Sequence, residues 1–255
     1  EAIAAFVNQV TPRTRLALVD QVTSPTALVL PVADIVEALQ SRGVDVLVDA
    51  AHGPGIVPLD LDAVGAAYTT GNCHKWLCTP KGAAFLHVRR DRQTGLRPLN
   101  ISHGATQPLG GRSRFRVEFD WPGTDDPTAW LCIPDAIRDV GAMMDGGWES
   151  IRERNRQLTL GGRRVLADAL GVSLPCPDEM VSAIATLILP DGFGATDGAD
   201  WTSDPLHERL LDDHRIQVPV FPWPDLGIRC LRISSQLYNH ADEVKHLGSV
   251  LRSLA

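Results

Sequence analysis

Short apolar runs alternate with polar segments over the first part of the chain. Three of these runs have the length of buried strands and lie at 15–19, 44–48 and 83–88. Residues 32–40 place apolar side chains at helical spacing, and Gly43, a residue typical of helix ends, follows them. The alternation of strands and helices predicts an α/β fold with a mostly parallel sheet, whose ligands bind beyond the carboxyl ends of the strands.

A different pattern begins after Gly171. It predicts strands at 182–189, 216–220 and 228–233 and helices at 205–214 and 240–254. Asn239 is expected to cap the last helix, with Asp242 reaching back to it. These elements form a smaller α+β domain that follows a long helix over 148–170. The predicted domains are therefore 1–150 and 151–255.

Residues 91–124 are rich in glycine and contain prolines and arginines, which predicts a long excursion from the sheet. Its arginines, Arg112, Arg114 and Arg116, are interpreted as part of a solvated or interface loop. A helix is expected after the excursion, capped by Thr124 or Asp125.

Composition narrows the class of protein. The net charge of −7 over 255 residues disfavours nucleic-acid or anionic-membrane partners, which need a basic surface. No apolar run approaches the roughly 20 residues that span a bilayer. The five cysteines are scattered without a C-x-x-C pair, which indicates a reduced, cytoplasmic protein. The chain opens without Met in what resembles the end of a helix, so we expect it to be the later part of a longer protein.

Lys75 is the main candidate for a catalytic residue, because it alone among the three lysines lies in a predicted cleft. A lysine that forms a Schiff base needs a neutral amine, which burial near another cation favours. A pyridoxal cofactor also needs a carboxylate at its ring nitrogen, donors for its phosphate and a group beside the ring. Asp49 could supply the carboxylate, Asn72 and His74 the donors, and His52 the contact with the ring.

Four motifs carry a resemblance to a known family. They are Asp49-Ala50-Ala51-His52, Asn72-x-His74-Lys75 with Pro80-Lys81-Gly82, Gly123-Thr124, and Leu231-Arg232-Ile233-Ser234 with Leu237-Tyr238-Asn239. In this order they resemble the class V aminotransferase superfamily of pyridoxal-phosphate enzymes, fold type I. The resemblance implies a three-layer α/β/α large domain with a smaller C-terminal α+β domain. The N-terminal part of the family fold, which supplies a phosphate-binding loop and an aromatic ring-stacker, has no counterpart here.

The same resemblance implies the role of each candidate residue. Lys75 would form the Schiff base with pyridoxal 5′-phosphate and move the Cα proton, while Asp49 pairs with the ring nitrogen and His52 contacts the ring oxygen. Asn72, His74 and Thr124 would hold the phosphate, with Thr124 contributed by the other subunit of a homodimer. Arg232 would bind the carboxylate of an amino-acid-type substrate. Independently of the resemblance, Ser24 follows the first predicted strand and is a candidate contact for cofactor or substrate.

These residues are compatible with several reactions of the family. Residues 214–227 contain no cysteine and Cys230 lies inside a predicted strand, which disfavours cysteine desulfurase activity. The run at 216–220 and the Arg232 motif instead resemble the isopenicillin N epimerase-like branch, and His103 is a candidate for the second base of an epimerisation. An aminotransferase or C–S lyase would share these residues. The alternatives of another class are a truncated, non-catalytic remnant and a metal-dependent hydrolase that uses Asp49, His52 and His74.

Overall fold

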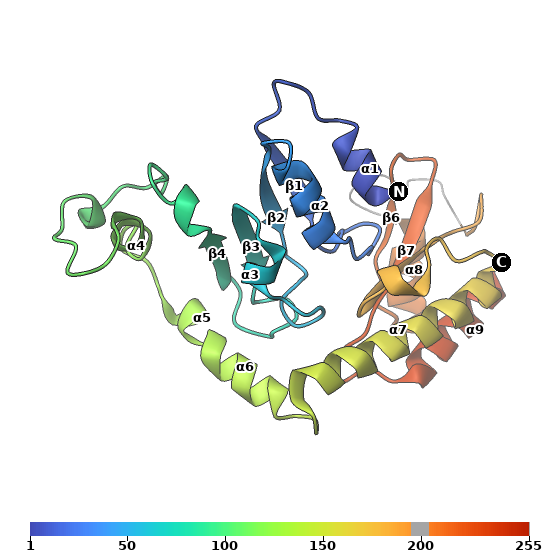
Figure 1. Cartoon of the computed structure of the whole chain (residues 1–255). Helices are drawn as coiled ribbons and strands as arrows, with labels where there is room; N and C mark the ends of the chain where they lie inside the picture. Colours follow the sequence, from blue (N-terminus) through green and yellow to red (C-terminus); the bar gives the residue numbers. More distant parts are fainter. Residues whose placement is uncertain (195–203, 255) are drawn as a thin grey trace. The chain divides into compact units, whose positions relative to one another are not determined.

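The computed structural model describes residues 1–194 and 204–254, and the chain divides into two compact units (Figure 1). The first unit comprises Glu1–Gln21, Pro31–Pro54 and Leu59–Arg138, and the second comprises Val22–Leu30, Gly55–Pro58 and Asp139–Ala255. Their main boundary falls within helix α6 (Ile133–Gly141). The domain boundary at residues 150/151 stays a prediction.

The first unit is built on a four-stranded sheet of order β1-β2-β3-β4. β1 (Leu16–Asp20), β2 (Asp45–Asp49) and β3 (Tyr68–Asn72) are parallel, whereas β4 (Ala84–Val88) pairs with β3 in the antiparallel direction. This mixed sheet confirms the predicted α/β class. Two of the polar residues that were expected beyond the strands are instead the last residues of strands, because Asp49 ends β2 and Asn72 ends β3.

Helix α2 (Val32–Gln40) covers one face of this sheet because its apolar residues recur every three or four positions. Those residues, Val32, Ile35, Val36 and Leu39, are all buried. On the opposite face, Leu16 and Leu18 are exposed by 52% and 62%, so that face is open in the described structure. The short helices α1 (Ala2–Val7) and α3 (Leu61–Val64) complete this part of the unit.

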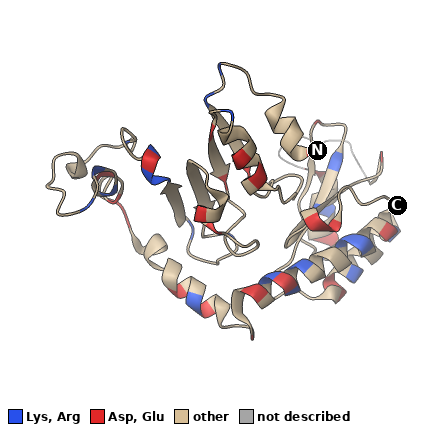
Figure 2. Cartoon of the chain, viewed as in Figure 1, with Lys and Arg blue, Asp and Glu red and all other residues tan. Residues whose placement is uncertain are grey.

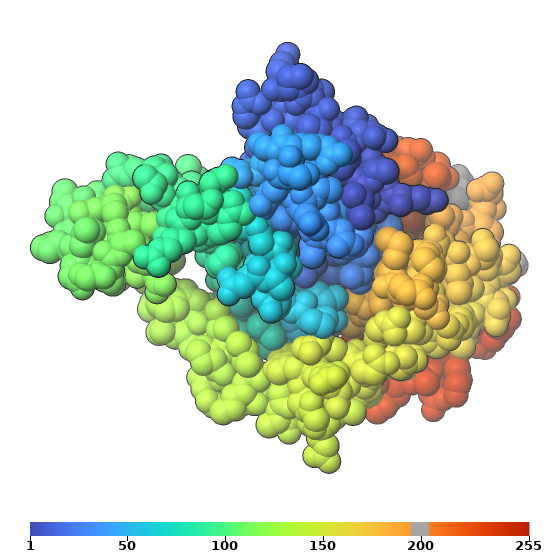
Figure 3. Space-filling model, in the orientation of Figure 1, coloured from blue at the N-terminus to red at the C-terminus, as the bar shows by residue number. Residues whose placement is uncertain are grey.

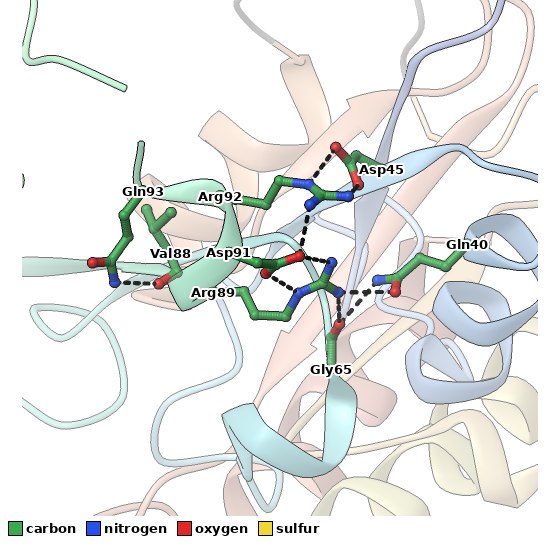
Figure 4. A network of polar contacts seen from close by, with 8 residues as sticks. All are labelled: Gln40, Asp45, Gly65, Val88, Arg89, Asp91, Arg92 and Gln93. Carbon is green, nitrogen blue, oxygen red and sulfur yellow. Dashed lines mark hydrogen bonds and ion pairs between the residues drawn. The ribbon is translucent and has the colours of Figure 1, made fainter. Parts of the chain in front are cut away.

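A polar network joins the segments at the start of β2 and the end of β4 (Figure 4). Arg92, in the 3₁₀ helix η1 (Arg90–Arg92), donates to both carboxylate oxygens of Asp45 at 2.8 and 3.0 Å. Arg89 donates to Gln40 and to the carbonyl oxygen of Gly65, the residue that ends α3 in a left-handed conformation. Asp45 begins β2 and Asp49 ends it, so this network fixes the end of the strand opposite the candidate site.

After η1 the chain leaves the sheet, as predicted, and forms the segment drawn in green in Figures 1 and 3. This excursion contains elements that the sequence pattern did not predict, η2 (His103–Ala105) and α4 (Arg114–Phe119), the latter capped by the Ser113 hydroxyl. The helix expected at Thr124 or Asp125 begins later, as α5 (Thr128–Leu131). The prediction of its cap was wrong because Pro127 precedes the helix and the Asp126 carboxylate accepts from Thr128 N.

The second unit packs its long helix α7 against an antiparallel sheet of order β5-β7-β6. Its strands are β5 (Ile184–Ile188), β6 (Val220–Pro222) and β7 (Arg229–Ser234), and its helices are α7 (Gly147–Leu170), α8 (Pro205–His214) and α9 (Ala241–Leu254), with the 3₁₀ turn η3 (Asp178–Met180). α7 carries basic and acidic side chains along its surface (Figure 2). α7 and α9 approach closely at Gly248, where an added Cβ would lie 3.3 Å from Val165.

Two expectations for this unit were wrong. The strand predicted at 216–220 is β6, which begins only at Val220, the first residue paired with β7. Asn239 does not cap α9 as predicted. Its side-chain oxygen accepts from Gln236 N, and the Glu243 carboxylate accepts from His240 N.

A buried ion pair anchors the start of α8. Asp204 is the N-cap, accepting from Leu206 N, and its carboxylate also binds Arg229 of β7 at 2.7 and 2.8 Å. The two side chains are 0% and 8% exposed. Among the described residues, no helix combines the length and apolar character needed to cross a bilayer.

Candidate functional site

Three polar residues lie level with one another at the carboxyl ends of the parallel strands. Asp20 is paired with Asp49, and Asp49 with Thr70, so their side chains share one face of the sheet. Burial, and next the charge of Asp49, raise the pKa of Asp20 above its ordinary value. Asp49 was predicted from the sequence. Asp20 was missed, although it ends an apolar run in the same way.

A tight turn after Asp49 carries His52. The Asp49 carboxylate accepts from Ala51 N at 2.8 Å, and the main chain of Asp49 accepts from Gln21 N at 2.8 Å. Gly53 follows where a Cβ would lie 2.0 Å from the buried side-chain oxygen of Gln21, so only glycine fits without a shift of that side chain. Ala50 N also donates to the carbonyl oxygen of Thr70 in β3 at 2.7 Å, so the turn is held from both neighbouring strands.

Lys75 lies in the turn that follows β3, and this turn meets the His52 turn. Lys75 Nζ is 3.3 Å from His52 Nε2, and Trp76 Nε1 donates to His52 Nδ1 at 3.2 Å. Both Cys73 N and His74 N donate to the carbonyl oxygen of Ala83, which holds the turn against β4. The structure thus brings together Lys75 and His52 as predicted, and adds Trp76, whose contact no sequence pattern indicated.

One ring nitrogen of His74 is a hydrogen-bond donor. Its Nδ1 is 3.0 Å from the carbonyl oxygen of Ala83, so Nδ1 must carry the proton. The ring can then donate from Nε2 to an anion such as phosphate only as the imidazolium. Asn72 lies two residues beyond Thr70 in β3 and so lies on the same face of the sheet as Asp49.

Arg232 and Ser24 meet in the second unit. Arg232 Nη1 donates to the carbonyl oxygen of Ser24 and lies 3.5 Å from its hydroxyl. The guanidinium lies over the Phe221 ring, 5.9 Å from its centroid, and burial lowers the pKa of Arg232. Its buried Nε has no hydrogen-bond partner among the described residues. A substrate carboxylate would provide one, since guanidinium and carboxylate form paired hydrogen bonds.

Thr124 lies elsewhere in the first unit, on an exposed loop between α4 and α5. Next to it is a cavity of about 560 Å³ lined by Phe119, Trp121 and Trp130, among others. Nothing in the described structure brings Thr124 to Lys75 within the chain.

The family model described as aminotransferase class-V matches residues 2–247. The chain belongs to the class-V aminotransferase family. It is 36% identical to the isopenicillin N epimerase of Streptomyces clavuligerus, over all of this chain and 64% of that protein. It is 33% identical to a probable chloroplastic L-cysteine desulfhydrase of Arabidopsis thaliana, over 95% of this chain and 51% of that protein. The chain therefore spans about half to two thirds of the length of these relatives.

A solved structure of the protein C-DES, with glycine covalently linked to its PLP cofactor, superposes with a TM-score of 0.81. The match covers 100% of this chain and 64% of that one at 20% identity, and it shows the shared fold. Membership of this family confirms the expected cofactor, pyridoxal 5′-phosphate. The residues fit it, because an amine, a carboxylate and an imidazole are placed on adjoining segments of one unit.

The metal-site alternative finds no counterpart. Within residues 1–194 and 204–254, no three His, Cys, Asp or Glu side chains are grouped so that they could hold a metal ion. Asp49, His52 and His74 therefore do not form such a site in the described structure.

Proposed function

We propose that the protein is a pyridoxal-phosphate-dependent enzyme that acts at the Cα of an amino acid or aminoacyl substrate through Lys75. The contact between Lys75 Nζ and His52 Nε2, next to the Asp49 turn, is the observation that carries this proposal. When bound, the cofactor supplies an electron sink that makes a Cα proton acidic. Lys75 supplies the amine that holds the cofactor and then the base that moves the proton.

The neighbouring residues would orient and retain the cofactor. Asp49 keeps a proton on the ring nitrogen, because a carboxylate favours the charged form of a base beside it. His52 contacts the ring oxygen, and Asn72 and His74 bind the phosphate. Ser24 and Arg232 bind the substrate, with Arg232 taking its carboxylate through the donors that Ser24 leaves available.

An isopenicillin N epimerase-like reaction is our first candidate, supported by the 36% identity over the whole chain. It needs only removal of the Cα proton and its return to the other face. His103 stays a prediction for the second base. C–S lyase chemistry is the second candidate, favoured by the 33% identity to a desulfhydrase, and aminotransfer uses the same first step.

Persulfide chemistry on a protein thiol has weaker support. Cys230 lies inside β7 and is 3% exposed, and burial raises the pKa of its thiol, which keeps it protonated. A C–S lyase that releases sulfide from its substrate needs no such thiol, so this argument disfavours a desulfurase without disfavouring a desulfhydrase.

We also propose a homodimer in which Thr124 of one subunit reaches the phosphate site of the other. The excursion and the helix α5 that follows it expose large apolar side chains, including Leu99 at 103%, Leu131 at 55% and Trp130 at 50%. Such exposure is typical of interaction surfaces.

The five cysteines are unpaired in the structure, which supports a reduced compartment such as the cytoplasm.

The test uses the full-length protein supplied with pyridoxal phosphate and candidate amino acids. Loss of optical activity, keto acid and sulfide are followed separately, with Lys75→Ala as the inactive reference and Lys245→Ala as the matched control. Racemisation alone supports the epimerase, and sulfide from cysteine supports the lyase. Absence of all three products, together with no visible cofactor band, would favour a non-catalytic remnant.

A further inference from the structure

Consecutive residues of the Lys75 turn contact the two nitrogens of a single imidazole. Trp76 Nε1 donates to His52 Nδ1 at 3.2 Å, and Lys75 Nζ lies 3.3 Å from His52 Nε2. All three side chains are half-buried. His52 is therefore a bridge between the indole and the lysine amine.

The indole decides which nitrogen of His52 carries the proton. An indole N–H can only donate, so Nδ1 must be an acceptor while this hydrogen bond is made. That excludes both the Nδ1–H tautomer and the imidazolium, which carries protons on both nitrogens. The remaining form is the neutral ring with its proton on Nε2, directed at Lys75.

An Nε2–H group can donate to Lys75 Nζ only if that nitrogen has a lone pair. An ammonium has three donors and no acceptor, so it would present a second donor to the same hydrogen bond. We propose that Trp76 is a positioning residue, which fixes His52 as the Nε2–H tautomer and thereby favours the neutral, nucleophilic amine of Lys75. This inference rests on the proposed role of Lys75 as the lysine that binds the cofactor, since only a neutral amine can attack an aldehyde.

Other ionisable groups at this edge of the unit either oppose the effect of the indole on Lys75 or do not contribute to it. The carboxylates of Asp20 and Asp49, at the ends of β1 and β2, would favour an ammonium. His74 directs its Nδ1 proton to Ala83, and burial raises the pKa of the Cys73 and Cys78 thiols, which keeps both neutral. The indole contact thus counters the electrostatic preference set by the two carboxylates.

The first measurement is the tautomer of His52 in the full-length protein, freed of cofactor and labelled with ¹⁵N-histidine. Long-range ¹H–¹⁵N correlation spectra distinguish the two tautomers and the imidazolium, and His52→Gln assigns the signal. We expect Nε2–H in the wild type and a mixture with Nδ1–H or imidazolium in Trp76→Phe. The matched control is Trp223→Phe, which removes an exposed indole in the second unit and should leave the signal unchanged.

The second measurement is the reactivity of Lys75 with trace acetic anhydride as a function of pH, read from its peptide by mass spectrometry. Lys81 and Lys245 serve as internal references. Loss of the indole donor should reduce the labelling of Lys75 at neutral pH several-fold, up to about tenfold, the effect of one hydrogen bond. The labelling of Lys81 and Lys245 should not change.

A shape-matched replacement separates the hydrogen bond from packing. Benzothienylalanine at position 76 keeps the bicyclic ring and lacks the N–H donor, so it should reproduce the effect of Trp76→Phe even if the latter folds poorly. Wild-type His52 protonated on Nδ1, or an unchanged tautomer and Lys75 reactivity in both variants, would overturn the inference. A tautomer that shifts as expected in a protein that never binds pyridoxal phosphate would instead overturn the proposed function.

Discussion

Asp20 and Asp49 are directly paired at the ends of two neighbouring parallel strands. Burial, and next the Asp49 charge, raise the pKa of Asp20. The Asp49 charge disfavours ionisation of Asp20, and the two carboxyl groups together concentrate negative potential at the sheet edge. A protonated ring nitrogen beside Asp49 would relieve that repulsion, which gives the pair a physical reason to favour a cationic ring.

Replacing Asp20 with Asn should stabilise the cofactor-free protein at neutral pH. Because its pKa is raised in the folded state, the native protein holds this proton more tightly than the unfolded chain. Wild-type stability therefore falls as the pH rises from the ordinary value, about 3.9, through the raised native value. Urea unfolding across this range should show the fall in the wild type and a smaller one in Asp20→Asn.

The Asp49→Asn background provides the control for that prediction. In that background Asp20→Asn should increase the free energy of unfolding by less, because the Asp49 charge is one of the two causes of the raised pKa of Asp20. An Asp20→Asn protein less stable than the wild type at neutral pH would contradict the assignment.

Elements with strong local signals were predictable from the sequence. α2 and α8 have the predicted bounds, since helical spacing marks the first and Asp204-Pro205 starts the second. The bounds of β6 were not predictable, because they depend on the ladder with β7 and not on the apolar run before Pro219. α4 was missed because its Arg-rich sequence lies in a segment without clear periodicity.

Gly104 should be intolerant of a side chain. A Cβ there would lie 2.3 Å from the carbonyl oxygen of Val117 and 2.9 Å from Glu118 Cα, and backbone cannot move aside cheaply. We expect Gly104→Ala to lower the free energy of unfolding by about 1–3 kcal/mol. Gly161→Ala is the matched control: it lies in α7 with nothing within 4 Å of its Cβ and should gain about 0.5–1 kcal/mol. Equal effects of the two substitutions would contradict this packing.

The Asp204–Arg229 pair predicts that two aspartates at opposite ends of α8 contribute very differently to the free energy of unfolding. Asp204→Ala leaves Arg229 buried without its partner and removes the helix cap, so it should destabilise the protein by about 3–5 kcal/mol. Asp213→Ala removes the exposed partner of Arg209, 3.8 Å away, and should cost about 0–1 kcal/mol. Chemical denaturation measures both; similar losses would show that the buried pair is not fixed as described.

Arg232→Lys tests the carboxylate site without removing the positive charge. A lysine cannot form the paired hydrogen bonds of a guanidinium, so KM for a carboxylate substrate should rise roughly ten- to hundredfold. The amide of the same substrate should be affected far less, and Arg209→Lys, an exposed arginine of α8, should change neither. Equal losses for acid and amide would count against a carboxylate contact.

The candidate site was only partly predictable. Lys75, Asp49 and His52 have a signal in the sequence, because each follows or ends a strand in a recognisable motif. The contact of Trp76 with His52 depends on how two separate turns meet, and the pairing of Asp20 with Asp49 depends on strand register. Neither relationship leaves a pattern in the order of residues. Thr124, predicted for the phosphate, needs a second subunit for its test.

The most direct measurement is borohydride reduction of the full-length protein after incubation with pyridoxal phosphate, followed by peptide mass spectrometry. Reduction makes the link between lysine and cofactor permanent, so the modified peptide identifies the lysine. We predict a phosphopyridoxyl group on Lys75, no visible cofactor band in Lys75→Ala, and an unchanged band in Lys81→Ala and Lys245→Ala. A modification confined to Lys81 or Lys245, or none at all, would contradict the central claim.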